Sequence, residues 1–177
     1  NIKKYKLMLF PVVNFKEWIE ENRHLLKPPV GNKVIWNNGD FIAMVVGGPN
    51  SRKDYHINQT AEFFYQVEGD IVLKIIDEGK PKDIHIKEGD IYLLPPNIPH
   101  SPRRPADTIG LVIEQKRAEN IQDGLVWFCE NCGHNMYEDE FSLQNIENDL
   151  KVIFDEFFSS VENRTCDSCG TVMDAPK

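Results

Sequence analysis

Residues 54–69 read DYHINQTAEFFYQVEG and contain two side chains that commonly bind metals, those of His56 and Glu62. The two residues lie six positions apart in a segment rich in aromatic and β-branched residues, which is typical of β-strands. A second stretch, GDIYLLPPNIPHSPRR at residues 89–104, supplies His100. If the two stretches fold onto each other, two imidazoles and one carboxylate could hold a metal ion and leave its other face open, as in non-haem Fe(II) oxygenases.

The region around these stretches is predicted to form a β-barrel. From residue 33 to about residue 114, short apolar or alternating runs are separated by turn sequences such as Asn38-Gly39 and Glu88-Gly89-Asp90. Such runs predict strands at residues 41–46, 63–67, 71–76, 84–86, 91–94 and 109–113. Many short strands at this spacing indicate a mainly β protein, folded as an antiparallel sandwich or barrel of the jelly-roll kind.

Two helices are predicted outside the barrel. Asn14 is expected to cap a helix that begins at Phe15, with Glu17 completing a capping-box-like pattern and Lys27-Pro28-Pro29 ending the helix. Ser142 is expected to cap a second helix later in the chain. The apolar stripe of this second helix is predicted to be core or dimer interface, and consists of Leu143, Ile146, Leu150, Ile153, Phe154 and Phe157.

All four cysteines lie in the last third of the chain, as the pairs Cys129-x-x-Cys132 and Cys166-x-x-Cys169. Two such pairs indicate four thiolates around one metal ion, as in structural zinc or rubredoxin-like iron sites. Two disulfides, or His134 in place of one cysteine ligand, are the alternatives. The aromatic residues expected to pack this four-cysteine unit are Trp127, Phe128 and Tyr137.

Length and charge narrow the class of protein. The 177 residues, 41% of them hydrophobic, suffice for one domain with a small appendage. We expect residues 1–32 to form an N-terminal helical segment, residues 33–118 the barrel, and residues 119–177 a C-terminal four-cysteine unit that can pack as part of the same domain. The net charge of −8 disfavours nucleic acid as a partner, because phosphates bind basic surfaces.

The sequence gives no reason to expect a membrane protein, because no apolar run is long enough to span a bilayer. The first residues, NIKKYKLMLFPVV, weakly resemble a signal peptide but lack a small-residue cleavage site. Paired cysteines without a convincing secretory signal favour a metal site over a disulfide framework. A cytoplasmic protein is therefore expected.

Two arginines flank the predicted metal ligands. Arg52 lies four residues before His56, and Arg104 lies four residues after His100. A guanidinium group binds a carboxylate through two parallel hydrogen bonds, so two arginines in the site of an acidic protein imply an anionic, planar substrate. Glu114 ends the apolar run TIGLVIE and is predicted to project inward, where it could contact a substrate amine or act as a general base.

The two stretches resemble the two cupin motifs, G-x5-H-x-H-x3,4-E-x6-G and G-x5-P-x-G-x2-H-x3-N. Asn50 and Asn58 depart from the first motif, and Asn97 and Arg104 depart from the second. Because Asn58 stands where the motif has its second histidine, three protein ligands remain, which is the number in a facial triad. The resemblance implies a cupin barrel, and the residues that match the motifs are His56, Glu62, Gly69, Gly89, Pro95 and His100.

Longer runs resemble the 3-hydroxyanthranilate 3,4-dioxygenase family, namely VGGPNSRKDYHINQTAEFFYQ, LLPPNIPHSPRRPADTIGLVIE and WFCENCGHNMYE. The likeness extends from Trp18 to Cys169. It implies an enzyme that inserts both atoms of O2 into 3-hydroxyanthranilate and opens the ring between C3 and C4. The implied product is 2-amino-3-carboxymuconate semialdehyde, which closes to quinolinate on the kynurenine route of tryptophan catabolism to NAD.

The same resemblance implies roles for particular residues. It places catalytic Fe(II) on His56, Glu62 and His100. It places the substrate carboxylate on Arg52 and Arg104, and acid–base chemistry or amine contact on Glu114. It also implies a structural zinc or iron ion on the four cysteines Cys129, Cys132, Cys166 and Cys169, and a homodimer.

Two other functions are compatible with the residues. The first is a cupin dioxygenase with a different small anionic substrate, although Arg52, Arg104 and Glu114 favour an aromatic amino acid. The second is a non-catalytic cupin that binds a metal or ligand and meets a partner through the four-cysteine unit. Zinc, manganese and nickel are also compatible with two histidines and a glutamate.

Overall fold

The computed structural model describes residues 9–28, 31–37, 39–118, 120–143 and 149–175. Strands dominate this part of the chain, so the prediction of a mainly β protein is confirmed. The elements are α1 (Phe15–Asn22), η1 (Arg23–Leu25), β1 (Asn32–Trp36), β2 (Phe41–Gly47), β3 (Asp54–Ile57), β4 (Glu62–Glu68), β5 (Ile71–Asp77), β6 (Lys80–Ile86), β7 (Ile91–Leu94), β8 (His100–Arg103), β9 (Ile109–Gln115), β10 (Asp123–Phe128), β11 (Asn135–Phe141) and α2 (Asp149–Ser159).

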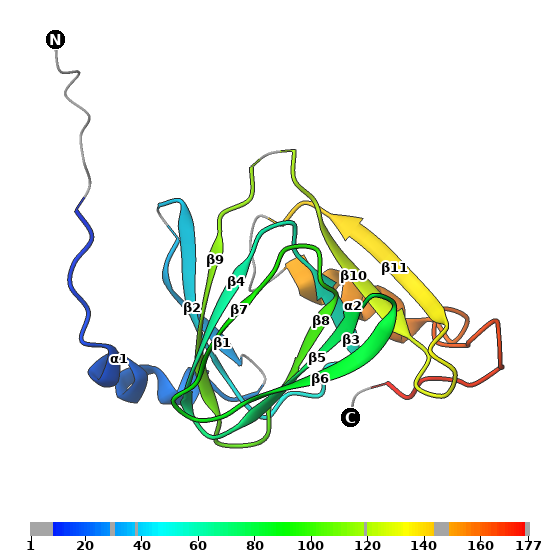
Figure 1. The fold of residues 1–177 in the computed structure, drawn as a ribbon, viewed down its shortest axis with the longest axis horizontal. Coiled ribbons are helices and arrows are strands. Elements are labelled where there is room, and N and C mark those ends of the chain that lie inside the picture. Colours follow the sequence, from blue (N-terminus) through cyan, green and yellow to red (C-terminus); the bar gives the residue numbers. More distant parts are fainter. Residues whose placement is uncertain (1–8, 29–30, 38, 119, 144–148, 176–177) are drawn as a thin grey trace, which may run out of the picture.

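The strands form two antiparallel sheets that face each other around a common interior (Figure 1). One sheet has the strand order β1-β2-β9-β4-β7, and the other has the order β11-β10-β3-β8-β5-β6. Neighbouring strands are mostly far apart in sequence, as expected for a jelly roll. The predicted cupin barrel is therefore present.

Alternation along the strands separates an inner from an outer face. Along β4, Glu62, Phe64 and Gln66 are buried, while the residues between them are partly exposed, because successive side chains point to opposite faces of a sheet. The inner face carries both a hydrophobic core and buried polar residues. The buried core residues are Met44, Phe64, Ile71, Leu73, Ile75, Ile86, Leu94 and Val112.

All six predicted strands are present, each as long as predicted or extended by a few residues. The sequence patterns did not delimit β1, β3, β8, β10 and β11. Two of these strands, β3 and β8, turn His56 and His100 into the barrel. Polar residues at buried positions break the apolar alternation by which strands are recognised, so such strands are hard to delimit from sequence.

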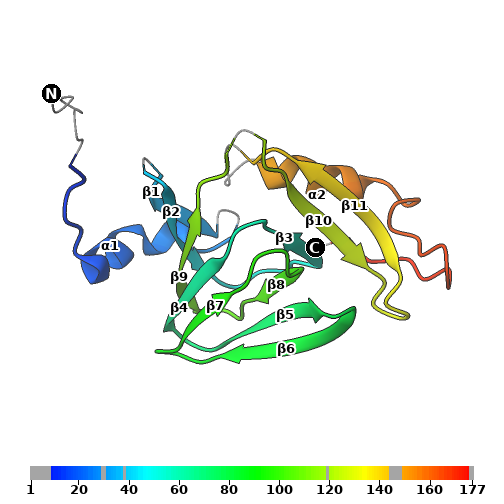
Figure 2. The same cartoon turned by 45° about the horizontal axis from the view of Figure 1, so that its top comes forward.

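The N-terminal helix lies outside the barrel, against the sheet that contains β2 and β9 (Figures 1 and 2). The side chain of Asn14 accepts a hydrogen bond from the backbone N–H of Glu17, at 3.4 Å, so the predicted cap of this helix is confirmed. Ile19 of α1 and Leu26 after η1 are buried against Val45 and Ile109. Their burial fixes the helix to the barrel.

Strands β10 and β11 belong to the six-stranded sheet of the barrel. β10 pairs with β3, and β11 pairs with β10, so the six-stranded sheet runs across the expected division at residue 118. Residues 117–124, RAENIQDG, have the polar composition of a connector, but the segment contains the start of β10 at Asp123. The division of the chain into a barrel and a C-terminal unit of residues 119–177 stays a prediction.

Helix α2 packs on β10 and β11, as both views of the fold show. Trp127 stacks on Phe157 with ring centroids 4.4 Å apart, and Tyr137 contacts the same two rings. Phe128 points elsewhere and contacts Tyr55. The predicted stripe of α2 is therefore core at Ile153 and Phe157, while Ile146 and the rest of residues 144–148 lie outside the described residues.

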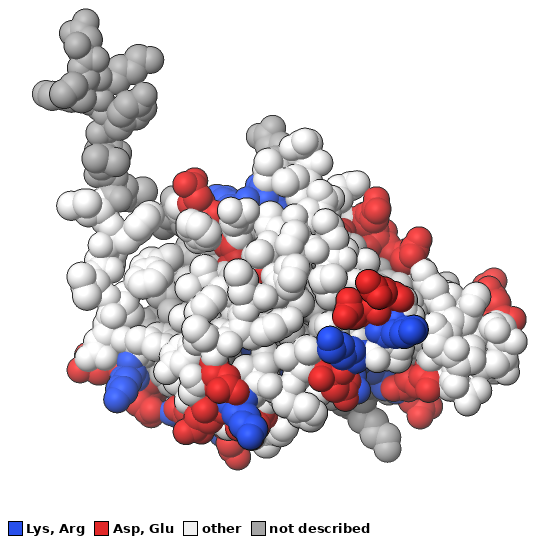
Figure 3. All heavy atoms as spheres, in the orientation of Figure 1, with Lys and Arg blue, Asp and Glu red and all other residues white. Residues whose placement is uncertain are grey.

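Charged groups of both signs are interspersed at the surface. On the face shown in Figure 3, lysine and arginine side chains lie next to aspartate and glutamate side chains, and no continuous basic patch forms there. Within the described ranges, no helix is both long and apolar enough to cross a bilayer.

Candidate metal centre and substrate pocket

Sheet register brings the predicted site residues together in two pairs. His56 on β3 lies directly opposite His100 on β8. Glu62 on β4 lies directly opposite Glu114 on β9, in the facing sheet. All four side chains are buried, so the site lies inside the barrel.

His56, Glu62 and His100 converge as a group that could hold a metal ion. One ligand atom from each lies within 4.8 Å of the others. Nδ1 of His56 lies 3.5 Å from Oε1 of Glu62, and Nε2 of His100 lies 3.3 Å from Oε2 of Glu62. Two nitrogen ligands and one carboxylate suit Fe(II), and also zinc or manganese.

The outer nitrogen of each imidazole has a partner that can only accept a hydrogen bond. Nε2 of His56 lies 2.6 Å from Oδ2 of Asp123, and Nδ1 of His100 lies 2.9 Å from the carbonyl oxygen of Ile98. Each of these ring nitrogens therefore carries the proton and donates it. The remaining nitrogens face Glu62, and a metal ion bound there would coordinate them in place of a proton.

The electrostatics of this group favour a positive charge at its centre. Burial alone would lower the pKa of His56, but the carboxylates of Asp123 and Glu62 outweigh burial and raise this pKa to about 9. Burial alone would raise the pKa of Glu62, but His100 and His56 hold it well below its usual range. A divalent cation at the point of convergence would satisfy the same carboxylate, so the donor set fits a metal ion.

Asn58 is one of the four departures from the cupin motifs. It contacts two carboxylates and is not part of the candidate ligand group. It is buried, and its amide nitrogen donates to Oε1 of Glu62 at 3.1 Å and to Oε2 of Glu114 at 3.2 Å. Its amide oxygen accepts hydrogen bonds from the N–H and hydroxyl of Thr60. A side chain fixed at both ends holds the carboxylate of Glu62 in one orientation.

Sequence reasoning missed Arg117 and Asp123, which lie in the supposed connector. Arg117 donates to Oδ1 and Oδ2 of Asp123, at 2.9 and 2.6 Å, and to Oε2 of Glu114 at 3.1 Å. This arginine thus links the carboxylate behind His56 to the predicted acid–base residue. The available signal was the apolar run GLVWF directly after Asp123, which reads as a strand that can carry Asp123 inward.

Glu114 projects into the barrel, as its strand position predicts. Nη1 of Arg117 lies 2.9 Å from Oε1 of Glu114, but the pair is not aligned as a hydrogen bond, and this oxygen has no hydrogen-bond donor among the described residues. Burial and the charge of Glu62 raise the pKa of Glu114 to about 7, and Arg117 partly offsets them. Glu114 therefore has one oxygen available to a substrate.

Arg104 also lies inside the barrel, with 3% of its surface exposed. Its Nη1 donates to Oε1 of Gln66 at 3.2 Å, and its Nε has no hydrogen-bond partner among the described residues. Burial and the charge of Arg52 lower the pKa of Arg104 to about 10, so the guanidinium stays charged at neutral pH. Asn50 fixes the backbone of this arginine, because its side-chain oxygen accepts from the N–H of Arg104. A buried, charged guanidinium with spare donors suits a carboxylate ligand.

Arg52 lies at the mouth of the same pocket and is partly exposed. It is paired with the buried carboxylate of Asp54, and its guanidinium carbon lies 5.8 Å from the centre of the Phe154 ring on α2. A planar guanidinium held by one carboxylate and one ring retains donors for a further anion.

The pocket combines these polar groups with apolar walls. Its lining includes the three candidate ligands, both arginines and Glu114, together with Met44, Val46, Phe64, Val112 and Leu150. A planar ring can pack between such walls while its substituents meet the polar groups. The predicted catalytic and substrate-binding residues thus lie in one pocket.

The four cysteines lie together near the end of the chain. Their sulfurs are within 4.8 Å of one another, with Cys129–Cys169 and Cys132–Cys166 distances of 3.6 Å, and all four are free thiols. Sulfurs about 2.3 Å from a central ion in a tetrahedron are about 3.8 Å apart, so the arrangement fits a metal ion. His134 is outside this cluster; its backbone carbonyl accepts from the N–H of Cys129, and its backbone also hydrogen-bonds to Cys132.

The two cysteine pairs have the same backbone geometry. The N–H of Gly133 donates to the carbonyl of Cys129, and the N–H of Gly170 donates to the carbonyl of Cys166, each at 2.8 Å. Both glycines have φ of 73°, a left-handed conformation that favours glycine. Each pair thus forms a turn that presents both of its sulfurs to the same ion.

A jelly-roll barrel that presents two histidines from one sheet and a glutamate from the facing sheet, with cations beside them, is a metal-binding cupin. Comparison with protein families narrows the class further, because the 3-hydroxyanthranilic acid dioxygenase family matches residues 8–158. The chain belongs to this family of dioxygenases.

Relatives agree with this membership. A protein from Xanthomonas euvesicatoria named 3-hydroxyanthranilate 3,4-dioxygenase is 55% identical over 170 residues, which cover 96% of each chain. A protein of the same name from Jannaschia sp. is 52% identical over 160 residues, covering 90% of this chain and 89% of the relative. Among solved structures, a cupin-2 domain protein from Shewanella frigidimarina is 21% identical, covers 59% of this chain and 95% of its own, and has a TM-score of 0.49.

Proposed function

We propose that this protein is an Fe(II)-dependent dioxygenase that converts 3-hydroxyanthranilate and O2 to 2-amino-3-carboxymuconate semialdehyde. The observation that carries the proposal is the presence of Arg52, Arg104 and Glu114 in one pocket with the three candidate metal ligands. Relatives that bear this enzyme name cover almost the whole chain, which supports the same substrate. Other small anionic substrates have no comparable support.

In this proposal, His56, Glu62 and His100 hold the iron, and the arginines orient the substrate. Arg104 binds the substrate carboxylate through donors that the protein leaves free, and Arg52 adds a second cation at the mouth. With the carboxylate held there, the ring lies between the apolar walls and its adjacent hydroxyl and amine groups point toward the three ligands. An iron ion held by His56, Glu62 and His100 would be chelated by these two groups, and it would supply a path for electron density from the ring to O2.

Glu114 is proposed to handle protons of the hydroxyl or amine group. Glu114 lines the pocket, its Oε1 accepts no hydrogen bond from the described residues, and Asn58 and Arg117 hold Oε2 in place. A carboxylate positioned in this way can accept a proton as the substrate binds and return it as the ring opens. Both atoms of O2 enter the substrate, so the ring-opened product carries a new carboxylate and a new aldehyde and no further reductant is needed.

The product is expected to close to quinolinate, which places the enzyme on the kynurenine route of tryptophan catabolism to NAD.

The four cysteines are proposed to hold a structural zinc or iron ion, since four thiolates leave no open position for a substrate. Free thiols that surround a metal favour the cytoplasm. We further propose a homodimer.

The proposal is tested by loading the protein anaerobically with Fe(II), adding 3-hydroxyanthranilate and then air, and following the ultraviolet band of the muconate semialdehyde. Glu62→Ala should abolish the band and fail to retain iron at the barrel site, while the four-cysteine site keeps its metal. An iron-loaded protein that gives no absorbance change would rule out this activity and leave only the metal-binding cupin. Turnover by an iron-free preparation would rule out the mechanism.

A further inference from the structure

A second pocket, of about 620 Å³, lies on the outer face of the six-stranded sheet. It shares no lining residue with the pocket around the candidate metal centre. Strand alternation separates the two, because Tyr55 and Arg103 point outward while their neighbours His56 and Arg104 point into the barrel. The second pocket is therefore a site separate from the candidate metal centre.

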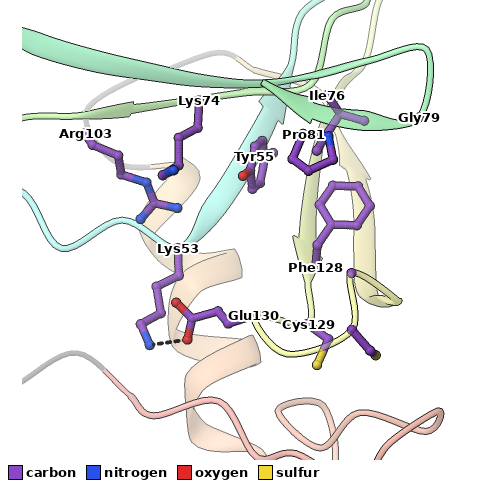
Figure 4. Close-up of a pocket in the computed structure, with 12 residues that line it drawn as sticks. Lys53, Tyr55, Lys74, Ile76, Gly79, Pro81, Arg103, Phe128, Cys129 and Glu130 are labelled. Atoms are coloured by element: carbon purple, nitrogen blue, oxygen red, sulfur yellow. Dashed lines mark hydrogen bonds and ion pairs between the residues drawn. The ribbon is translucent and has the colours of Figure 1, made fainter. Parts of the chain in front are cut away.

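One side of the second pocket is cationic. Figure 4 shows the side chains of Lys74 and Arg103 reaching the same region, and the hydroxyl of Tyr55 pointing toward them. Lys74 is paired with Asp83 at 3.0 Å, and Asp83 does not line the pocket. Arg103, by contrast, has no hydrogen-bond or ion-pair partner in the described part of the chain, and its Nε is buried. The pocket thus contains one guanidinium that forms no direct ion pair with a described carboxylate, while the charges of Asp54 and Glu130 act on it from farther away.

A third cation of the pocket is already neutralised. Nζ of Lys53 lies 2.9 Å from Oε2 of Glu130, and both residues line the pocket (Figure 4). Because Lys53 and Glu130 pair with each other, the charge of Arg103 is the one that a ligand would neutralise. Arg103 is partly buried, and a bound anion would offset the loss of water around its guanidinium.

The other side of the pocket is apolar and aromatic. Phe128, Pro81 and Ile76 line it, and Phe128 meets the Tyr55 ring edge-on with ring centroids 5.4 Å apart. Aromatic rings of this kind offer a face and an edge to a further planar ring. The pocket therefore has an apolar half and a cationic half.

We propose that this outer pocket is a second binding site, which takes a small aromatic monocarboxylate with its carboxylate on Arg103 and its ring against Phe128 and Tyr55. One guanidinium without a direct ion pair matches one negative charge, and the planar fork of arginine matches a carboxylate. Lys74 and the Tyr55 hydroxyl can donate to the same carboxylate. The site does not depend on the proposed activity.

A ligand in this pocket would connect the barrel to the four-cysteine unit. Cys129, Cys132 and Gly133 of the first cysteine turn line the pocket, together with residues of β3, β5, β6 and β8. Contact with both parts predicts that an occupied pocket raises the melting temperature of the protein, because ligands that bind only the folded state stabilise it.

The test uses the metal-loaded protein and a trifluoromethyl-substituted benzoate, followed by fluorine NMR. Because benzoate could also bind at Arg52 and Arg104, the titration is done in an Arg52→Gln background. We expect saturable binding there, and we expect Arg103→Gln in the same background to weaken it by roughly tenfold or more. Arg103→Lys, which keeps the charge, should restore part of the affinity, and the neutral benzamide analogue should not bind.

Lys82→Gln provides a matched control. Lys82 is an exposed cation on β6 that does not line the pocket, so its removal should leave benzoate binding unchanged. Melting curves of each variant show whether it is folded. Absence of binding in the Arg52→Gln protein, or equal binding after Arg103→Gln in a folded protein, would overturn the second site. Neither outcome affects ring cleavage, which is measured separately.

Discussion

Oδ2 of Asp123 lies 2.6 Å from Nε2 of His56, across a sequence separation of 67 residues. Asp123 is fully buried, and Arg117 donates to both of its oxygens. The carboxylate therefore fixes which nitrogen of His56 carries the proton and turns the other nitrogen toward Glu62. Asp123 and Arg117, which are not candidate ligands, thus orient the imidazole of His56 toward the candidate metal centre.

Asp123→Asn is expected to weaken Fe(II) binding by roughly 10- to 100-fold, because the amide keeps the size of the carboxylate and loses its charge. The measurement is a competitive titration of the protein against a chromogenic iron chelator. Asp77→Asn, which changes a half-exposed carboxylate at the end of β5, is the control and should bind iron normally. Unchanged affinity in Asp123→Asn would show that the hydrogen bond to His56 does not prepare the site.

Gly110→Ala is expected to raise KM for 3-hydroxyanthranilate by about tenfold or more, with iron content unchanged. A Cβ at this position would lie 2.8 Å from Oε1 of Gln66 and 2.9 Å from Nη1 of Arg104, so the guanidinium must move. Steady-state kinetics alongside iron analysis provide the measurement. Gly124→Ala is the matched control, because its Cβ would meet only the side chain of Ile57, at 3.4 Å or more. An unchanged KM in Gly110→Ala would argue against a carboxylate on Arg104.

Cys166→Ser is expected to lower the melting temperature and the metal content of the four-cysteine unit, while turnover per barrel-bound iron changes much less. Structural thiolate sites contribute folding free energy through the bound metal. The check is calorimetric melting, metal analysis and turnover normalised to barrel iron in the same preparation. A proportionate collapse of turnover, with barrel iron and folding intact, would instead assign the four cysteines a part in the reaction.

Arg23→Gln is expected to lower the unfolding free energy near neutral pH by ~0.2–1 kcal/mol, since both side chains of this pair are about one-third exposed. Arg23 donates to both oxygens of Glu68 at 2.9 Å, and this bond lowers the pKa of Glu68. A carboxyl group with a lowered folded-state pKa stabilises the fold above its ordinary pKa, and the stabilisation is lost as pH falls.

Urea unfolding of the wild type and of Arg23→Gln at several pH values provides the measurement. The difference between the two proteins should be present near neutrality and disappear once Glu68 is protonated in acid. Added salt should reduce it as well, because the pair is partly exposed. A difference that stays constant down to acid pH would show that packing, not charge, accounts for the effect.

Much of the site could be predicted from spacing along the chain. Residues on one strand share a face by the alternation of side chains, and the two short motifs place His56, Glu62 and His100 on strands that turn inward. Arg104 and Glu114 follow from the same alternation. The four cysteines are likewise readable, because a CxxC turn brings two sulfurs together without help from the rest of the fold.

The partners of these residues could not be read in this way. Asp123 and Arg117 lie in a segment that looks like a polar connector, and only the pairing of β10 with β3 brings Asp123 behind His56. Asn58 reads as a missing ligand, and only its buried position shows that it holds two carboxylates.

The sequence by itself determined six of the strands, the candidate metal ligands and the cysteine cluster, because these depend on periodicity and on short local turns. Only the tertiary structure decided which nitrogen of His56 faces Glu62, which oxygen of Glu114 accepts no hydrogen bond, and that Arg103 in an outer pocket has no direct partner among the described residues. These features depend on the register between strands distant in sequence, which residue spacing along the chain does not specify.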